Sequence, residues 1–86
     1  MKATRQFDWN QANIGHIARH AVTPAEVEQA FANGLRGVVD YIRQNERRSN
    51  GIGTTDAGRE LVVVFTMRRG RVRTVTAFPY TGRSNV

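Results

Sequence analysis

The hydrophobic pattern of this sequence changes its period once, at Gly34. Before this glycine, apolar residues recur at the three- and four-residue spacing of amphipathic helices. After it, apolar residues alternate or run together among β-branched residues and glycines, as they do in strands. Helices followed by strands predict an α+β fold. The 86 residues suffice for one small domain, so we expect a single domain over residues 1–86, frayed at 1–5 and 84–86.

The first expected helix covers about residues 10–20. Its apolar stripe follows the i, i+3, i+4, i+7 spacing at Ile14, Ile17, Ala18 and Ala21. The face away from the isoleucines is polar and rich in imidazole, and it carries Asn13, His16 and His20, with Arg19 at its margin. This face therefore carries the side chains of the helix that are candidates for catalysis or binding.

The second expected helix begins at Thr23-Pro24. A capping threonine, a proline at the first helical position and Glu26 three residues after the cap form a capping box. Val27, Ala30 and Phe31 form its buried face, and Asn33-Gly34 supplies the left-handed end of the helix.

The second half of the chain predicts four strands, the second of them weak, at about residues 37–43, 47–54, 60–67 and 71–78. The run from Leu61 to Phe65 is apolar on both faces, which indicates a central strand. Arg69-Gly70 has the spacing of a tight hairpin between the last two strands. We expect both helices to cover one face of a mainly antiparallel sheet of four to five strands and to leave the other face open.

Positive charge is concentrated in the strand half. The net charge is +6, and residues 1–33 balance three basic against three acidic side chains, so the whole excess lies beyond residue 33. All but one of the 13 basic residues are arginines, which favour bidentate contacts with phosphate. The pattern indicates a polyanion or an acidic protein as partner. The alternative is that arginine only keeps the sheet soluble.

Other classes of protein fit the sequence poorly. There is no cysteine, which excludes disulfides and thiolate metal sites, and no apolar run has the length of a membrane span, so we expect a cytoplasmic protein. His16 and His20 have the i, i+4 spacing of zinc ligands, but no motif places further ligands beside them. Gly51-Ile52-Gly53 is too short for a phosphate-binding loop. We expect neither a metal nor another cofactor.

A histidine-bearing helix beside a basic sheet suits metal-independent RNA cleavage, in which a 2′-hydroxyl attacks its own phosphate. The reaction needs groups that accept and return protons and a cation that stabilises charge on the phosphoryl oxygens. Imidazole can exchange protons near neutral pH, whereas arginine is limited to the charge role. The candidates are His20 and His16 for protons, Arg59, Arg71 and Arg73 for phosphate, and Tyr41, Tyr80 or Trp9 for base stacking. Each arginine has the alternative of being a solvated surface charge.

The order of these segments resembles the BrnT family of bacterial type II toxins, which are similar in fold to RelE-like ribonucleases. The resemblance runs from about residue 7 to 83, and it is carried by the segments 7–10, 19–31, 53–65 and 71–77. It implies a ribonuclease toxin neutralised by a DNA-binding antitoxin of ribbon-helix-helix type, with no specific DNA binding by this chain alone. We expect His20, Arg59 and Arg73 to be catalytic, and RNA to be bound by Trp9, His16, Arg19, Arg71, Tyr80 and Arg83.

The chain also departs from the family pattern. Phe78 stands where the family tends to have an arginine, Ala21 stands for a glycine, and the tail around Arg83 is short. These departures favour an alternative, in which the chain is a non-catalytic module that binds an antitoxin or RNA. A third interpretation is a small housekeeping domain with incidental positive charge.

Overall fold

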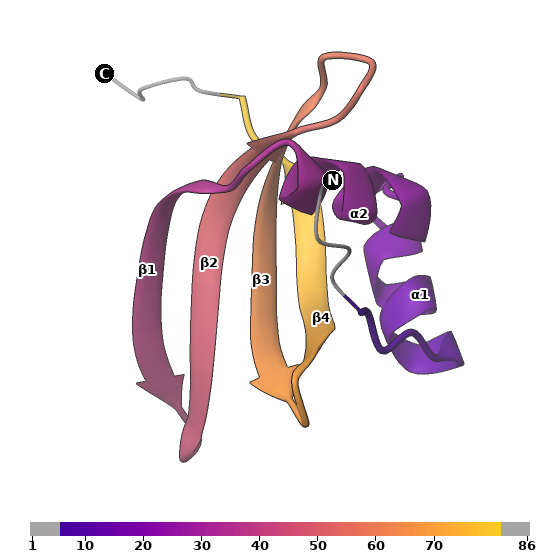
Figure 1. Cartoon of the computed structure of the whole chain (residues 1–86). Helices are drawn as coiled ribbons and strands as arrows, with labels where there is room; N and C mark the ends of the chain where they lie inside the picture. Colours follow the sequence, from indigo (N-terminus) through magenta and orange to yellow (C-terminus); the bar gives the residue numbers. More distant parts are fainter. Residues whose placement is uncertain (1–5, 82–86) are drawn as a thin grey trace.

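The computed structural model describes residues 6–81, in which two helices lie on one face of a four-stranded sheet (Figure 1). The elements follow the chain as α1 (Gln11–Ala18), α2 (Pro24–Ala32), β1 (Arg36–Arg43), β2 (Glu46–Thr54), β3 (Glu60–Arg68) and β4 (Arg71–Pro79). The strand order is β1-β2-β3-β4 and every pairing is antiparallel, so each strand lies beside its neighbour in sequence. The predicted α+β fold is confirmed, and the strand predicted to be weak is a full member of the sheet.

The core lies between the helices and every second residue of β3. Leu61, Val63 and Phe65 are buried, because alternate side chains of a strand point to the same face. α1 packs mainly on β4, and α2 packs on β2 and β3. The remaining core residues are Ile17, Val22, Val27, Ala30, Val72 and Ala77. The helices thus cover the side of the sheet nearest β4. Neither helix has the length and apolar character needed to cross a membrane.

Both helices begin with reciprocal caps. At α2 the predicted capping box is present, since Thr23 Oγ1 accepts from the Glu26 amide and Glu26 Oε1 accepts from the Thr23 amide. At α1 the same exchange joins Asn10 and Asn13, and Asn13 Nδ2 also donates to the Asp8 carbonyl at 2.9 Å.

The helical wheel misplaced three residues of α1, of which Ala18, expected in the apolar stripe, is exposed. Asn13, expected on the polar face, is only 8% exposed, whereas Ile14, expected in the apolar stripe, is 39% exposed. The cap explains the difference, because hydrogen bonds satisfy the buried amide of Asn13 and hold that face inward. The helix also ends at Ala18, so His20 lies in the turn that follows it.

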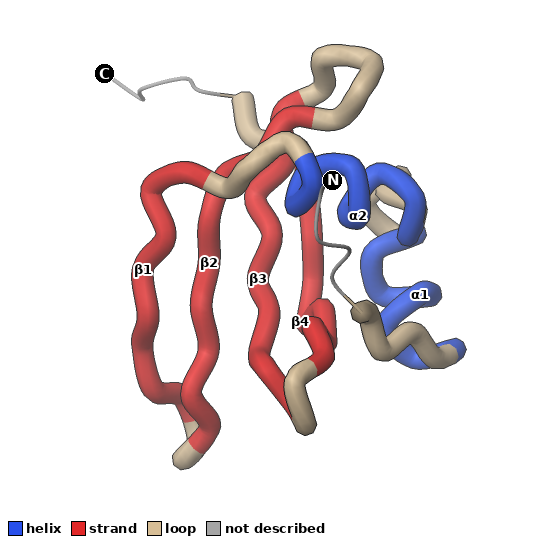
Figure 2. Tube along the Cα trace, viewed as in Figure 1, coloured by secondary structure: helices blue, strands red, loops and turns tan. Residues whose placement is uncertain are grey.

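The β3–β4 hairpin closes as predicted through Arg69 and Gly70. Both residues have positive φ, 54° and 76°, as a two-residue turn of this kind requires. Figure 2 shows that this turn and the β1–β2 turn lie at the same end of the sheet, apart from each other. The ladder between β2 and β3 runs only from the Ser49–Phe65 pair to the Thr54–Glu60 pair, so the two hairpins diverge beyond it.

The segment before α1 covers the outer edge of β4. Phe7 forms a parallel bridge with Val72, supported by bonds from the Asp8 amide to the Val72 carbonyl (2.8 Å) and from the Val72 amide to the Gln6 carbonyl (2.9 Å). The Phe7 ring also packs edge-on against Phe31 at 5.3 Å between centroids. The four strands and this single bridge fit the expected four to five strands.

The contact between α2 and β2 depends on Gly53. A Cβ atom at this position would lie 2.7 Å from the Ala30 Cβ and 2.8 Å from the Ala30 carbonyl oxygen, so no larger residue fits without moving α2. We predict that Gly53→Ala lowers the free energy of unfolding by roughly 1–3 kcal/mol, as overpacking does elsewhere. Urea denaturation followed by circular dichroism measures the change.

Gly15→Ala is the matched control for that substitution. Gly15 lies in α1, and a methyl group added there would meet no other part of the described chain within 4 Å. Alanine should therefore raise the free energy of unfolding by up to ~1 kcal/mol through its higher helix propensity. Equal stability of Gly53→Ala and the wild type would contradict the close approach of α2 to β2.

Candidate functional site

The predicted site residues fall into two groups at opposite ends of β4. His20 lies beside Phe78, with 6.0 Å between ring centroids, whereas Arg73 stands five positions earlier in the strand. Five strand residues span roughly 16 Å. We call His16, His20 and Phe78 the histidine end, and Glu46, Arg48 and Arg73 the arginine end.

A β-bulge places both ends on the same face of β4. Val64 pairs with Thr76 and Phe65 pairs with Thr74, so Val75 is an extra residue in β4. The bulge shifts the alternation of side chains, and Arg73 and Phe78 therefore both belong to the face opposite the helices.

The histidine end presents two imidazoles to solvent. His16 and His20 are both exposed, and their ring centroids are 6.3 Å apart. His20 is held by its amide, which donates to the Ile17 carbonyl at 3.0 Å, and Arg19 between them is the C-cap of α1. This end therefore presents two imidazoles, the side chain that most often acts as a general acid or base, with Arg19 between them in the sequence.

Arg59 fixes the turn that carries His20. Its Nη1 donates to the Ala21 carbonyl at 2.8 Å and to both carboxylate oxygens of Glu26, at 3.0 and 3.2 Å. Partial burial raises the pKa of Glu26, but hydrogen bonds from the Thr23 backbone and from Arg59 outweigh it, so the pKa lies below its ordinary value. In this structure Arg59 joins the β2–β3 loop to the turn between the helices.

The arginine end is built around one carboxylate. Glu46 Oε1 accepts from Arg48 Nε and Glu46 Oε2 accepts from Arg73 Nη2, both at 2.8 Å. The hydrogen bond from Arg48 chiefly lowers the pKa of Glu46, and the charge of Arg73 adds to it against the effect of desolvation. Arg73 Nε is buried without a partner among the described residues. Two guanidiniums against one carboxylate leave a net positive charge.

The β3–β4 turn adds further arginines. Arg68, Arg69 and Arg71 surround a shallow depression together with Asp8. Of these three arginines only Arg71 was expected at the site, although the run Arg68-Arg69-Gly70-Arg71 places all three at one hairpin turn.

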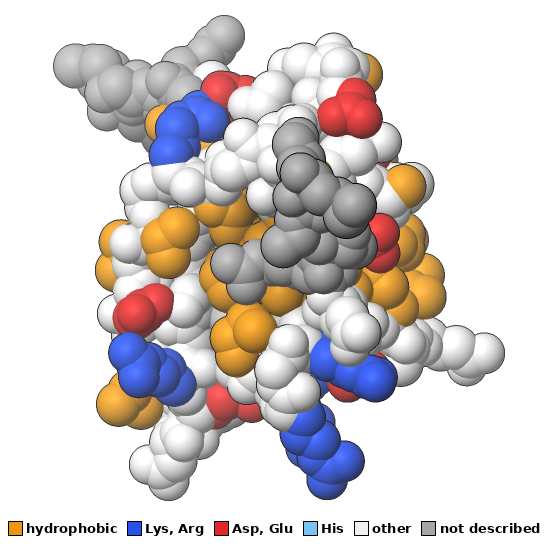
Figure 3. Space-filling view, in the orientation of Figure 1, with side chains coloured by type: hydrophobic (Ala, Val, Ile, Leu, Met, Phe, Trp, Pro, Cys, Tyr) orange, Lys and Arg blue, Asp and Glu red, His pale blue; other side chains and the backbone are white. Residues whose placement is uncertain are grey.

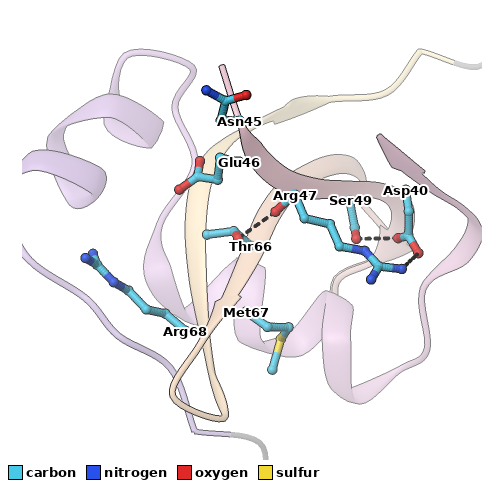
Figure 4. Close-up of a pocket in the computed structure, with 8 residues that line it drawn as sticks. All are labelled: Asp40, Asn45, Glu46, Arg47, Ser49, Thr66, Met67 and Arg68. Carbon is cyan, nitrogen blue, oxygen red and sulfur yellow. Dashed lines mark hydrogen bonds and ion pairs between the residues drawn. The ribbon is translucent and has the colours of Figure 1, made fainter. Parts of the chain in front are cut away.

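A cleft opens where the two hairpins diverge (Figure 4). Thr66 Oγ1 crosses it and donates to the Arg47 carbonyl at 2.7 Å. On one side Asp40 accepts hydrogen bonds from Ser49 and Arg47, and these together with Arg47's charge lower the pKa of Asp40. The cleft also includes Asn45, Glu46, Met67 and Arg68, so it borders the arginine end.

The predicted stacking residues differ in their surroundings. The Trp9 indole is half-buried, stacks on Phe7 at 6.1 Å and donates to Glu28 Oε2 at 2.8 Å, so it packs the N-terminal segment onto the core. Tyr80 is 39% exposed two residues beyond Phe78. Arg83 lies outside the described residues. Within residues 6–81 no group of three or more metal-binding side chains gathers.

Residues 8–83 match a family of ribonuclease toxins from type II toxin-antitoxin systems. That family is the BrnT toxins, and because the match covers most of the chain, the chain belongs to it. The resemblance noted from the sequence is thereby confirmed. Comparison with curated proteins and with solved structures found no match.

The backbone at Ala21 generates a prediction about stability. Its φ of 58° lies in the left-handed region, which costs a residue with a Cβ roughly 1–2 kcal/mol. Glycine has no such cost but loses more entropy on folding, so Ala21→Gly should raise the free energy of unfolding by about 0.5–1 kcal/mol. Thermal denaturation measures it. A lower melting temperature would mean that the turn is not in this conformation.

The Glu26–Arg59 pair generates a prediction about pH. Because the pKa of Glu26 is lowered on folding, the unfolded chain takes up its proton first, and the stability from this carboxylate is lost as pH falls below the ordinary value of 4.5. Glu26→Gln should be less stable at neutral pH and lose less stability on acidification. Urea midpoints measured from neutral pH to below the ordinary value test this, with Glu28→Gln as control, because glutamine keeps an oxygen that can accept from the Trp9 indole. Parallel curves for wild type and Glu26→Gln would contradict it.

Proposed function

We propose that this BrnT-family chain cleaves RNA without a metal ion, through attack of a 2′-hydroxyl on the adjacent phosphate, and that His20 exchanges protons in this reaction. The observation that carries the proposal is the exposed His20 at one end of β4, on the edge of the same sheet face that holds the arginine end. An RNA strand that follows β4 would meet both.

The proton steps fit the histidine end. A base removes the proton from the 2′-hydroxyl, its oxygen attacks phosphorus to form a 2′,3′-cyclic phosphate, and an acid protonates the departing 5′-oxygen. His20 serves as one of these groups, and the His16 imidazole, 6.3 Å away, lies within reach of the same nucleotide to bind it or to supply the other proton transfer.

The arginines have different roles, some in binding phosphate and one in positioning His20. Arg73 and Arg71 hold backbone phosphates along β4, and Arg19, the C-cap of α1 between the two histidines in sequence, adds a positive charge at the histidine end. Arg59 was expected to be catalytic, and we propose that it contributes mainly by positioning, because all three of its hydrogen bonds hold the turn that carries His20. Tyr80, exposed beyond Phe78, is the better placed residue for stacking on a base, since the Trp9 ring is already stacked.

As a type II toxin, the chain has an antitoxin protein as partner and RNA as target. We infer further that the fold is of the RelE-like kind, that the pair works in the cytoplasm, and that the antitoxin is a ribbon-helix-helix protein that binds DNA for both. These finer points rest on the family resemblance.

A second function has its own support. Phe78, which stands where the family tends to have an arginine, contacts His20 itself, and Arg73 is paired with Glu46. A chain without turnover would then use the same surface only to bind RNA or the antitoxin. Salt-sensitive RNA binding without fragments would identify this function.

The deciding experiment is cleavage of end-labelled single-stranded RNA by the purified chain in excess EDTA. Wild type should produce fragments, and His20→Ala should reduce the rate by roughly 10²–10⁴, the usual contribution of a general acid or base. His16→Ala, measured in parallel, should lose a similar factor if His16 supplies the other proton transfer and less if it only binds the nucleotide. Equal rates for wild type and His20→Ala, with both proteins folded, would remove His20 from the mechanism.

A further inference from the structure

The two edges of the sheet are protected very differently. At β4 the backbone of Gln6 to Asp8 bonds to Val72, and α1 packs against the strand. β1, at the opposite edge, pairs only with β2 among the described residues, and seven of its eight residues are exposed. A bulge between Arg36 and Val39 leaves residues 39–43 as the regular part of this edge. An edge strand with unpaired backbone groups is a template for another strand.

Three apolar side chains are exposed at this edge, beside the exposed Asp40 and the arginines at the two ends of β1. Val38, Val39 and Ile42 are 50%, 57% and 76% exposed, and Met67, two strands away, is 49% exposed. Figure 3 shows hydrophobic side chains uncovered over β1, next to acidic and basic groups, in the view of Figure 1. Soluble monomers rarely leave such a group of large apolar side chains together without a binding role.

Charge distinguishes the possible occupants of this edge. Arg43 ends β1 with no ion pair among the described residues, whereas Arg36 at its start is paired with Glu60, and each copy of the chain carries a net charge of +6. In an antiparallel pair of two copies centred on Tyr41, the charged Arg43 and Asp40 would lie opposite the apolar Val39 and Ile42. The net positive charges of the two copies would also repel each other. An extended segment with apolar residues in its middle and acidic residues at its ends would match the edge instead.

We propose that the exposed edge of β1 is the docking site for an extended, acidic segment of the antitoxin, which adds a fifth strand to the sheet. This inference rests on the proposed partnership with an antitoxin and is independent of the chemistry assigned to His20. Main-chain hydrogen bonds to the residues of 39–43 that face away from β2 supply affinity, and the apolar side chains and Arg43 select the partner.

A peptide probe tests the docking site. The probe is a fluorescein-labelled peptide of alternating valine and threonine flanked by glutamates, and the control peptide has lysines in place of the glutamates. Anisotropy should show binding of the first peptide alone. Hydrogen exchange should slow at the amides of Asp40 and Ile42, which point away from β2, and leave the β4 amides unchanged.

Charge reversal at the edge locates the contact. Arg43→Glu should weaken the glutamate-flanked peptide about tenfold and improve the lysine-flanked one, because one attraction becomes a repulsion. Arg69→Glu, in the turn between β3 and β4 and therefore separated from β1 by β2, changes the net charge equally and should have little effect.

Three results would overturn the proposal. They are no binding at roughly millimolar peptide, equal weakening by both charge reversals, and a concentration-dependent dimer of the chain alone with protected β1 amides. The peptide assay contains no RNA, so RNA cleavage that persists without peptide binding would overturn this inference and leave the proposed function intact. Peptide binding by a chain that does not cleave RNA would overturn the proposed RNA cleavage and leave this inference intact.

Discussion

The close approach of α2 to β2 is the constraint on which the rest of the structure depends. Gly53 lies directly against Ala30, and Asn33 at the end of the helix donates to the Thr54 carbonyl at 2.8 Å. With α2 fixed in this way, Glu26 in its first turn meets Arg59 from the β2–β3 loop, and Arg59 in turn holds the Ala21 carbonyl. The position of His20 is thus set by packing some distance from it.

The histidine end and the arginine end lie on the same strand, β4, but differ in whether their side chains already have a charged partner. The imidazoles at the histidine end are exposed, whereas the guanidiniums at the arginine end already have a carboxylate partner in Glu46. Any phosphate bound there competes with Glu46 or is held by the remaining donors of Arg48 and Arg73. The chain's net charge attracts a polyanion, while Glu46 limits how much of that charge is available at this point.

The asymmetry of the sheet edges separates the surfaces available for substrate and partner. The N-terminal segment and α1 occupy the edge at β4, close to the candidate RNA surface, whereas within residues 6–81 β1 pairs only with β2. In a domain this small, one sheet face has to be covered by helices to form a core, so contacts with other molecules fall on the open face and the free edge.

The sequence alone determined the fold class, the strand positions, the capping box at Thr23 and the Arg69-Gly70 turn, because each depends on residues close together in the chain. It also indicated the BrnT family, through the order of its segments. It did not determine that Asn13 is buried, that Arg59 braces the turn of His20, that Glu46 joins Arg48 to Arg73, or that a bulge at Val75 aligns both ends of β4. Only the tertiary structure decided these features, because they depend on hydrogen bonds and strand registers between segments that no local pattern connects.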